Sequence, residues 1–233
     1  MYTYATDQLG INNVGLIPFR YDDFDRDKDI PERAYSYGSP IRLAVPGMIS
    51  DRRNYHELLN SICISELKDK IELVLLGRPD DEYGIEIIAK AKDLNNQGYK
   101  ITFWNEFISD SEFENEIHKA HLLFSYFDSK YKTNNGQEEI YGISKETGIT
   151  LLMYNKAKVA LLPATFNQME SIRNQTIFYQ DFEELQRILV SMYEGNIDLD
   201  GLNLNAIENA ESMNLGNIIQ ELELAYENQL NRR

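Results

Sequence analysis

The chain is 233 residues long and carries 38 acidic and 23 basic side chains, which gives a formal net charge of −15. A chain of this length and ordinary composition buries enough surface to fold as one large domain without a disulfide or a metal. The strong negative charge argues against a generic binder of nucleic acids or of anionic membranes, because both functions need a basic surface.

The first 39 residues are predicted to form an N-terminal extension. The apolar segment 14–19 is compatible with a short strand ended by Pro18. Residues 22–32 alternate in charge and contain Pro31, which indicates an exposed connection.

Regular alternation begins at Ile41. Six short runs are almost continuously apolar, as strands buried on both faces of a parallel sheet are. The predicted strands are 43–45, 71–76, 99–103, 122–127, 159–162 and 176–179.

Helical periodicity separates these strands. Ser109 and Glu112 have capping-box spacing and predict the start of a helix that carries Phe113 and Ile117. Further helices are predicted at 144–155 and 181–193. Two apolar helix faces are predicted in the first two crossovers, one made by Tyr55, Leu58, Leu59 and Ile62 and the other by Ile85, Ile87, Ile88 and Ala91. This alternation predicts an α/β fold, a doubly wound and mainly parallel six-stranded Rossmann-like sheet with right-handed crossovers.

The residues after Gly195 are predicted to form an acidic C-terminal helical segment. From Asp181 to the end, the chain has 11 acidic and 3 basic residues. Residues 196–205 are rich in Asn and Asp and are predicted to be irregular, and a helix follows at about 206–231 with a kink or break at Gly216. The predicted organisation is thus an extension at 1–39, a Rossmann-like domain at 40–195 and a helical segment at 196–233.

Candidate binding residues follow the first strand. Ligands of an open parallel sheet bind beyond the carboxyl ends of its strands. Gly47 is followed by Arg52 and Arg53 at a helix start, where guanidinium groups and free backbone N–H groups together suit a diphosphate. The alternative is a solvated turn in which one arginine pairs with Asp51. No G-x-G-x-x-G motif follows this strand, so an NAD-type site is not expected.

The second strand ends at Gly77, which allows a close approach of backbone to a ligand. Arg78 can reach an anion there. It can equally be neutralised by Asp80 or Asp81.

The fourth strand is followed by a long polar loop at 128–136 and then by Glu138 and Glu139. Ser144 is predicted to cap the next helix, with Lys145, Thr147 and Gly148 in its first turn. A lysine, a hydroxyl and a glycine at a helix N-terminus suit phosphate oxygens, and a plain helix cap is the alternative.

Other reactive side chains favour structural roles. Glu114, His118 and His121 have helical metal-site spacing, but no fourth ligand is evident, and an ordinary helix end is favoured. We therefore expect no metal, and no cofactor. The single Cys63 excludes an intramolecular disulfide and is predicted to be a small packing residue, and His56 a surface or capping residue.

The compartment is predicted from the same composition. One cysteine in 233 residues fits a reducing environment. No apolar run approaches the ~20 residues of a membrane span, and the N-terminus lacks a signal-peptide pattern. We expect a cytoplasmic protein with no membrane span.

In their order, these segments resemble the C-terminal, nucleotide-sugar-binding domain of GT-B glycosyltransferases of the retaining, metal-independent kind. The resemblance covers about residues 40–194. It rests on Val45-Pro46-Gly47 with Arg53-Asn54, the strand ending at Gly77, the segment from Ile101 to Ile117, and the segment from Lys158 to Pro163. Lys145, Thr147 and Gly148 resemble a variant with Lys-x-Ser/Thr-Gly at the donor-binding helix. The chain departs from the family at Met48, where a basic residue is frequent, and at Leu151, where a glutamate is usual.

The resemblance implies a protein that binds a nucleotide-diphosphate sugar and transfers the sugar to an acceptor, a hexosyltransferase activity. The implied donor-binding residues are Gly47, Arg53, Gly77, Arg78, Lys145, Thr147 and Gly148, with Glu138 or Glu139 near the sugar hydroxyls. A complete GT-B enzyme has two Rossmann-like domains, so the acceptor side is expected from a second domain, another chain or a homodimer mate. A non-catalytic Rossmann-like subunit that partners a glycosyltransferase is the alternative.

Overall fold

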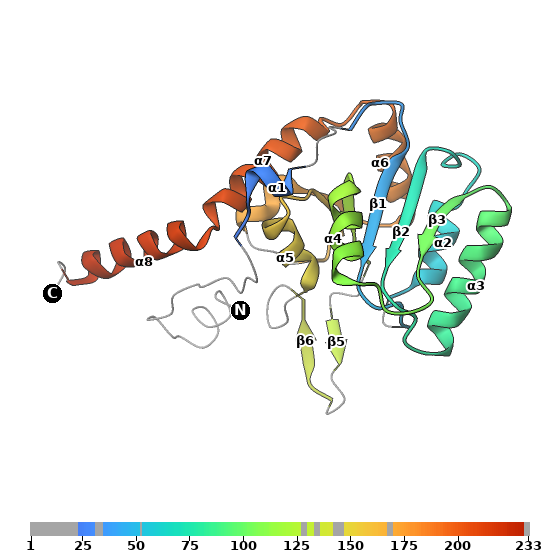
Figure 1. The fold of residues 1–233 in the computed structure, drawn as a ribbon, viewed down its shortest axis with the longest axis horizontal. Helices are drawn as coiled ribbons and strands as arrows, with labels where there is room; N and C mark the ends of the chain where they lie inside the picture. Colours follow the sequence, from blue (N-terminus) through green and yellow to red (C-terminus); the bar gives the residue numbers. More distant parts are fainter. Residues whose placement is uncertain are drawn as a thin grey trace.

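A parallel sheet of six strands lies at the centre of the molecule (Figure 1). This computed structural model describes residues 23–30, 35–51, 53–126, 130–132, 136–141, 147–166 and 170–230. The strands of the sheet are β1 (Ile41–Pro46), β2 (Ile71–Leu76), β3 (Lys100–Phe103), β4 (Leu122–Phe124), β7 (Ala160–Pro163) and β8 (Thr176–Tyr179). Their order is β3-β2-β1-β4-β7-β8, which is the order of a doubly wound Rossmann-type sheet. The predicted fold class and the six predicted strands are confirmed.

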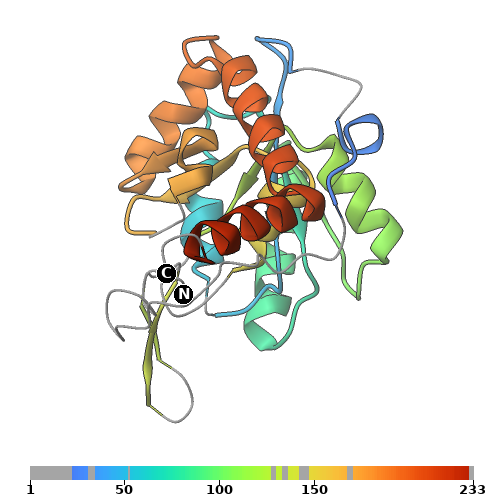
Figure 2. The same cartoon turned by 90° about the vertical axis from the view of Figure 1, so that its left-hand side faces the viewer.

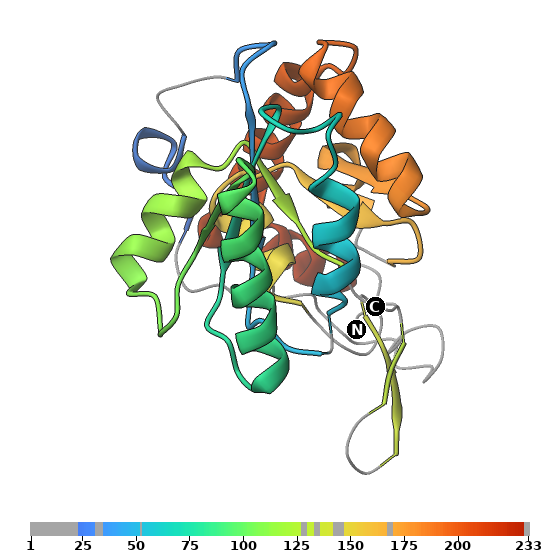
Figure 3. The same ribbon diagram turned by 90° about the vertical axis from the view of Figure 1, so that its right-hand side faces the viewer.

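Helices cover both faces of this sheet, and Figure 3 shows α4 on one side and α2 and α6 on the other. Because side chains alternate along a strand, Leu43 packs with α2, α3 and α6, whereas its neighbour Ala44 packs with α4 and α5. The helices are α1 (Arg26–Asp29), α2 (Tyr55–Ile62), α3 (Glu82–Asn96), α4 (Asp110–Lys119), α5 (Gly148–Asn155), α6 (Phe182–Tyr193), α7 (Leu199–Ser212) and α8 (Leu215–Leu230), with a 3-10 helix, η2 (Glu170–Gln175).

The predicted apolar helix faces are largely correct. All four predicted residues of α2 are buried, and so are Ile87, Ile88 and Ala91 of α3. Ile85 is 63% exposed, so its assignment to the buried face was wrong. At 100° per residue, Ile85 lies to one side of the stripe that Gly84, Ile88 and Ala91 form on α3.

The C-terminal segment is more helical than predicted. Residues 199–205 belong to α7 and are not irregular, because Asp198 caps that helix by accepting a hydrogen bond from the Gly201 N–H at 2.9 Å. Leu199, Ala206 and Ala210 bury the inner face of α7 in the main core. The break predicted near Gly216 lies slightly earlier, between α7 and α8, and α8 extends away from the sheet (Figure 1).

A two-stranded hairpin replaces part of the predicted polar loop. Its antiparallel strands are β5 (Lys130–Lys132) and β6 (Glu138–Ile140), and it projects from the body in Figures 1 and 2. The strand predicted within residues 14–19 lies outside the described residues. Among the helices that the structure describes, none is long and apolar enough to cross a membrane.

Candidate functional site

A cavity of about 840 Å³ lies at the carboxyl edge of the sheet, where ligands of this architecture bind. Three walls form it. The first is made by the loops after β1 and β2, the second by the start of α4, and the third by α5. The first wall contains Pro46, Gly47, Met48, Arg53, Leu76, Gly77 and Arg78. Five of the nine residues predicted from the sequence therefore line one cavity, namely Gly47, Arg53, Gly77, Arg78 and Gly148.

The loops after β1 and β2 lie against each other, backbone on backbone. The Gly47 N–H donates to the Leu76 carbonyl at 3.1 Å, and the Ile49 N–H donates to the Arg78 carbonyl at 3.0 Å. A Cβ on Gly77 would stand 2.6 Å from the carbonyl carbon of Gly47, closer than real Cβ atoms come. Only glycine fits at position 77, and the paired loops form a rigid rim of the cavity.

Arg53 brings a positive charge to this rim. Its guanidinium donates to the Pro46 carbonyl and lies against Gly47, where a Cβ would be 2.7 Å from Nη1. Gly47 also has a φ of +111°, a conformation that glycine adopts without strain. The hydroxyl of Tyr83 fixes the Arg53 backbone, since it donates to the Arg53 carbonyl at 3.2 Å and accepts the Tyr55 N–H at 2.9 Å.

The two arginines of the rim, Arg53 and Arg78, differ in whether a carboxylate neutralises their charge. Arg78 is paired with Asp80 at 3.5 Å, as the alternative interpretation of the sequence held. Arg53 makes no ion pair with any carboxylate in the described ranges of the chain. Arg53 is thus the cation of the cavity wall that is available to an anion. Arg52 lies outside the described residues.

The start of α5 differs from the prediction. Thr147, and not Ser144, is the N-cap, and its hydroxyl accepts the Ile149 N–H at 3.5 Å. Thr147 is buried, whereas Gly148 is the first helical residue and borders the cavity. A Cβ on Gly148 would meet no atom within 4 Å, so glycine is not required there by its neighbours. Lys145 and Ser144 fall outside the described residues.

The two walls made by α4 and α5 combine apolar and charged groups that were not among the predicted binding residues. Phe107 is 75% exposed at the cavity, and Phe113 lies on the same wall. Lys156 binds the Glu114 carboxylate at 2.7 Å and the Asp29 carboxylate at 2.9 Å. Burial alone would lower the pKa of Lys156, but these two hydrogen bonds outweigh it and raise the pKa. The signal that locates Phe107 is its place just beyond the carboxyl end of β3.

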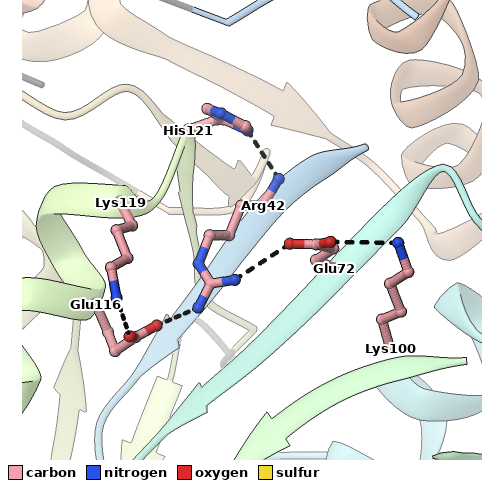
Figure 4. A network of polar contacts seen from close by, with 6 residues as sticks. All are labelled: Arg42, Glu72, Lys100, Glu116, Lys119 and His121. Carbon is pink, nitrogen blue, oxygen red and sulfur yellow. Dashed lines mark hydrogen bonds and ion pairs between the residues drawn. The ribbon is translucent and has the colours of Figure 1, made fainter. Parts of the chain in front are cut away.

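An ion-pair network holds α4 against the sheet (Figure 4). The Arg42 guanidinium on β1 donates to Glu116 of α4 and, at 3.2 Å, to Glu72 of β2. Lys119 adds a second contact to Glu116 at 3.0 Å, and Lys100 lies 3.4 Å from Glu72. Burial raises the pKa of Glu116, but its bonds to Arg42 and Lys119 prevail and lower it below the ordinary value. The network fixes the helix whose first turns form the cavity wall.

The remaining candidates lie elsewhere. Glu138 and Glu139 are on β6 of the projecting hairpin and are not among the residues that line the cavity. The Nδ1 of His121 accepts the Arg42 backbone N–H at 2.9 Å. Cys63 ends α2, and its burial raises the thiol pKa to about 11. Across the described ranges, no three His, Cys, Asp or Glu side chains gather to hold a metal ion.

Comparison with known proteins shows which solved structures share this fold. No model of a known protein family matches the sequence, and no curated protein matches it. Solved structures do match. The Anabaena protein Alr3699/HepE, crystallised in complex with UDP, aligns with a TM-score of 0.55 and 10% identity over 82% of this chain and 49% of its own. The α,α-trehalose-phosphate synthase (UDP-forming) of Burkholderia vietnamiensis gives 0.53 and 9% over 84% and 46%. The sucrose-phosphate synthase of Thermosynechococcus elongatus gives 0.53 and 14% over 84% and 47%.

The chain shares the fold of part of these structures, which are GT-B glycosyltransferases. Identities of this size show the fold alone. The chain spans just under half the length of these three structures. The GT-B resemblance inferred from the ordered sequence segments is therefore confirmed for the fold, and the site residues stay predictions.

Proposed function

We propose that the chain binds a nucleotide-diphosphate sugar in the 840 Å³ cavity and serves as the donor-binding half of a retaining, metal-independent glycosyltransferase. The observation that carries the proposal is Arg53, a cation without an acidic partner among the described residues, held against the glycine rim at the carboxyl edge of a Rossmann-type sheet. A forked guanidinium beside exposed backbone is suited to diphosphate oxygens.

Other residues of the cavity suit the phosphates and the nucleobase of such a ligand. Gly47 lets the Arg53 guanidinium lie against the rim, and Arg78 adds a second cation once Asp80 is displaced. Phe107 offers an exposed aromatic face on which a nucleobase can stack. We place the diphosphate between the Arg53 rim and Gly148 at the start of α5, and the base toward Phe107. The parts of Lys145 and Thr147 at the diphosphate, and of Glu138 or Glu139 at the sugar hydroxyls, stay predictions from the sequence.

The acceptor side is assigned to a second domain, another chain or a dimer mate. The matched structures are about twice as long as the aligned part of this chain. In this proposal, residues 40–195 form the donor-binding domain, residues 1–39 are an extension, and residues 196–233 are a helical segment that joins it to the acceptor side.

The binding claim is tested by thermal unfolding with UDP, GDP, ADP and their glucose conjugates, each with and without EDTA. A ligand at about 100 times its dissociation constant stabilises the fold by about 2.7 kcal/mol. For a chain of this size, that raises the melting temperature by about 5–11 °C. The proposal predicts this shift for at least one nucleotide, unchanged by EDTA. No shift with any of them would refute it.

The role of Arg53 is tested with Arg53→Met and a control, Arg187→Met, which removes the same charge from an exposed position on α6. We expect Arg53→Met to weaken nucleoside-diphosphate binding at least about tenfold, since charged hydrogen bonds contribute about 1.5–3 kcal/mol. Binding of the uncharged nucleoside should not change in either variant. An equal loss for nucleoside and diphosphate would show that Arg53 acts through the fold.

A further inference from the structure

A second cavity lies at the opposite, amino edge of the sheet and has a volume of about 290 Å³. It is formed where α7 and the α1 segment meet the residues that precede β4 and β7, among them His121 and Lys158. The ion pair between Arg26 and Glu211 at 2.8 Å joins the segments of α1 and α7. An apolar cavity of about 150 Å³ holds a benzene molecule, so this one has room for about twelve non-hydrogen atoms.

The decisive group in this cavity is Lys158, which is only 3% exposed. Its Nζ donates to the His118 carbonyl at 2.9 Å and to the Ala120 carbonyl at 2.8 Å, which leaves one N–H of the ammonium. No carboxylate of the described residues forms an ion pair with it. The charge of Asp29 acts to raise the pKa of Lys158, but the Asp29 carboxylate is bonded to Lys156 at 2.9 Å. Buried charges in proteins are normally paired, so Lys158 lacks its counter-ion.

His121 supplies a second donor. Its Nδ1 accepts the Arg42 backbone N–H, as Figure 4 shows, so the neutral ring carries its proton on Nε2. Burial and the nearby cations Lys158 and Arg42 lower the pKa of His121, which keeps the ring neutral near pH 7. The cavity thus presents one ammonium and one neutral N–H donor to an acceptor group.

The other walls select the rest of the ligand. Ile30, Leu199 and Ile207 make them mainly apolar. Asp29 and Asp200 also line the cavity, and their negative charges disfavour a dianion such as phosphate. A single negative charge on a short apolar body fits this combination.

We propose that this second cavity binds a small organic monocarboxylate, with its carboxylate at Lys158 and His121 and its apolar body against Ile30, Leu199 and Ile207. The ligand would complete the neutralisation of Lys158 and tie α7 to the sheet. This proposal is independent of the nucleotide cavity.

The test uses the full chain and three acids that share one carbon skeleton, 4-methylpentanoate, leucine and 2-hydroxy-4-methylpentanoate. Thermal unfolding and calorimetry are expected to show saturable binding of at least one acid, and the ranking identifies the α-substituent that the site prefers. The uncharged 4-methylpentanamide and inorganic phosphate serve as ligand controls and should not bind. Absence of saturable binding by all three acids at millimolar concentration, or equal binding of the amide, overturns the proposal.

Variants place the binding in this cavity. Lys158→Met should weaken binding at least about tenfold, whereas Lys92→Met, at an exposed lysine of α3, should not. Because loss of Lys158 can also destabilise the fold, Ile207→Phe provides a second variant that retains the lysine and fills the space. Binding that survives Ile207→Phe would overturn the proposal. In the wild type, the carboxylate should also raise the pKa of Lys158, measured by NMR of its ¹³Cε.

Discussion

Replacing Gly77 with alanine tests whether the paired loops build the candidate site. The new Cβ would stand 2.6 Å from the Gly47 carbonyl carbon and 3.1 Å from the Met48 Cα, whereas real Cβ atoms essentially never come within 3.0 Å. The contacts are backbone atoms, so no side chain can swing away, and the two loops must separate. Overpacking of this kind costs about 1–3 kcal/mol. Separation also strains the hydrogen bonds from Gly47 and Ile49, each contributing about 1 kcal/mol.

We therefore expect Gly77→Ala to lower the free energy of unfolding by about 3 kcal/mol and the melting temperature by about 6–12 °C. Gly148→Ala is the matched control on the same cavity, because its Cβ would enter open space. It should leave stability unchanged or raise it by up to ~1 kcal/mol, since alanine restricts the unfolded chain more than glycine does. Urea unfolding of both variants gives the comparison. Equal stability of the two variants would refute the close-packed loop geometry.

Three other predictions concern single groups. Since Arg42 and Lys119 lower the pKa of Glu116, the wild type should exceed Glu116→Gln in stability above about pH 4.5, and the gap in urea unfolding should close as the pH falls further. Burial lowers the pKa of Lys158 from 10.5 to about 8, so the folded protein binds fewer protons at this side chain than the unfolded chain does between pH 8 and pH 10.5. The stability of the wild type relative to Lys158→Met should therefore rise from pH 8 to pH 10.5. A difference that does not change with pH would contradict this. Phe107→Ala should change the free energy of unfolding by less than ~0.5 kcal/mol, because the ring is exposed, yet weaken nucleotide binding by about tenfold in calorimetry.

The sequence predicted the sheet well because its strands are buried on both faces. A strand such as β2 must then be apolar at nearly every position, and that run is visible without any knowledge of its neighbours. The strands of the β5–β6 hairpin are only three residues long, and the segments around Lys130 and Glu138 carry no such apolar run. The first part of α7, residues 199–205, was also missed, since a segment rich in Asn and Asp has low intrinsic helix propensity. The packing of Leu199, together with Ala206 and Ala210, into the main core supplies the stabilisation that local preference lacks.

The cavity, too, contains some residues that the sequence alone reveals and others that only the folded structure brings together. Gly47, Arg53 and Gly77 could be found because each directly follows a strand, and the topology alone brings these positions to one edge. The ion pair of Lys156 with Glu114 joins two helices that are remote in sequence, and no spacing rule reveals it. Thr147 was misplaced for a different reason, because several residues before Gly148 are acceptable caps and only the three-dimensional structure selects one.

The distribution of charge around the two cavities is compatible with the proposed anion binding by a chain with a net charge of −15. Most described cations that approach either cavity are already matched, with Arg78 paired to Asp80 and Lys156 to Asp29 and Glu114. Arg53 and Lys158 are the exceptions among the described cavity residues, one at each edge of the same sheet. A low-dielectric wall strengthens the field of such an unmatched cation, and distant acidic residues are screened within about 10 Å at 0.1 M salt. Each cavity therefore presents an unmatched cation although the molecule is acidic, and we expect the proposed anion binding at both to depend only weakly on the overall charge.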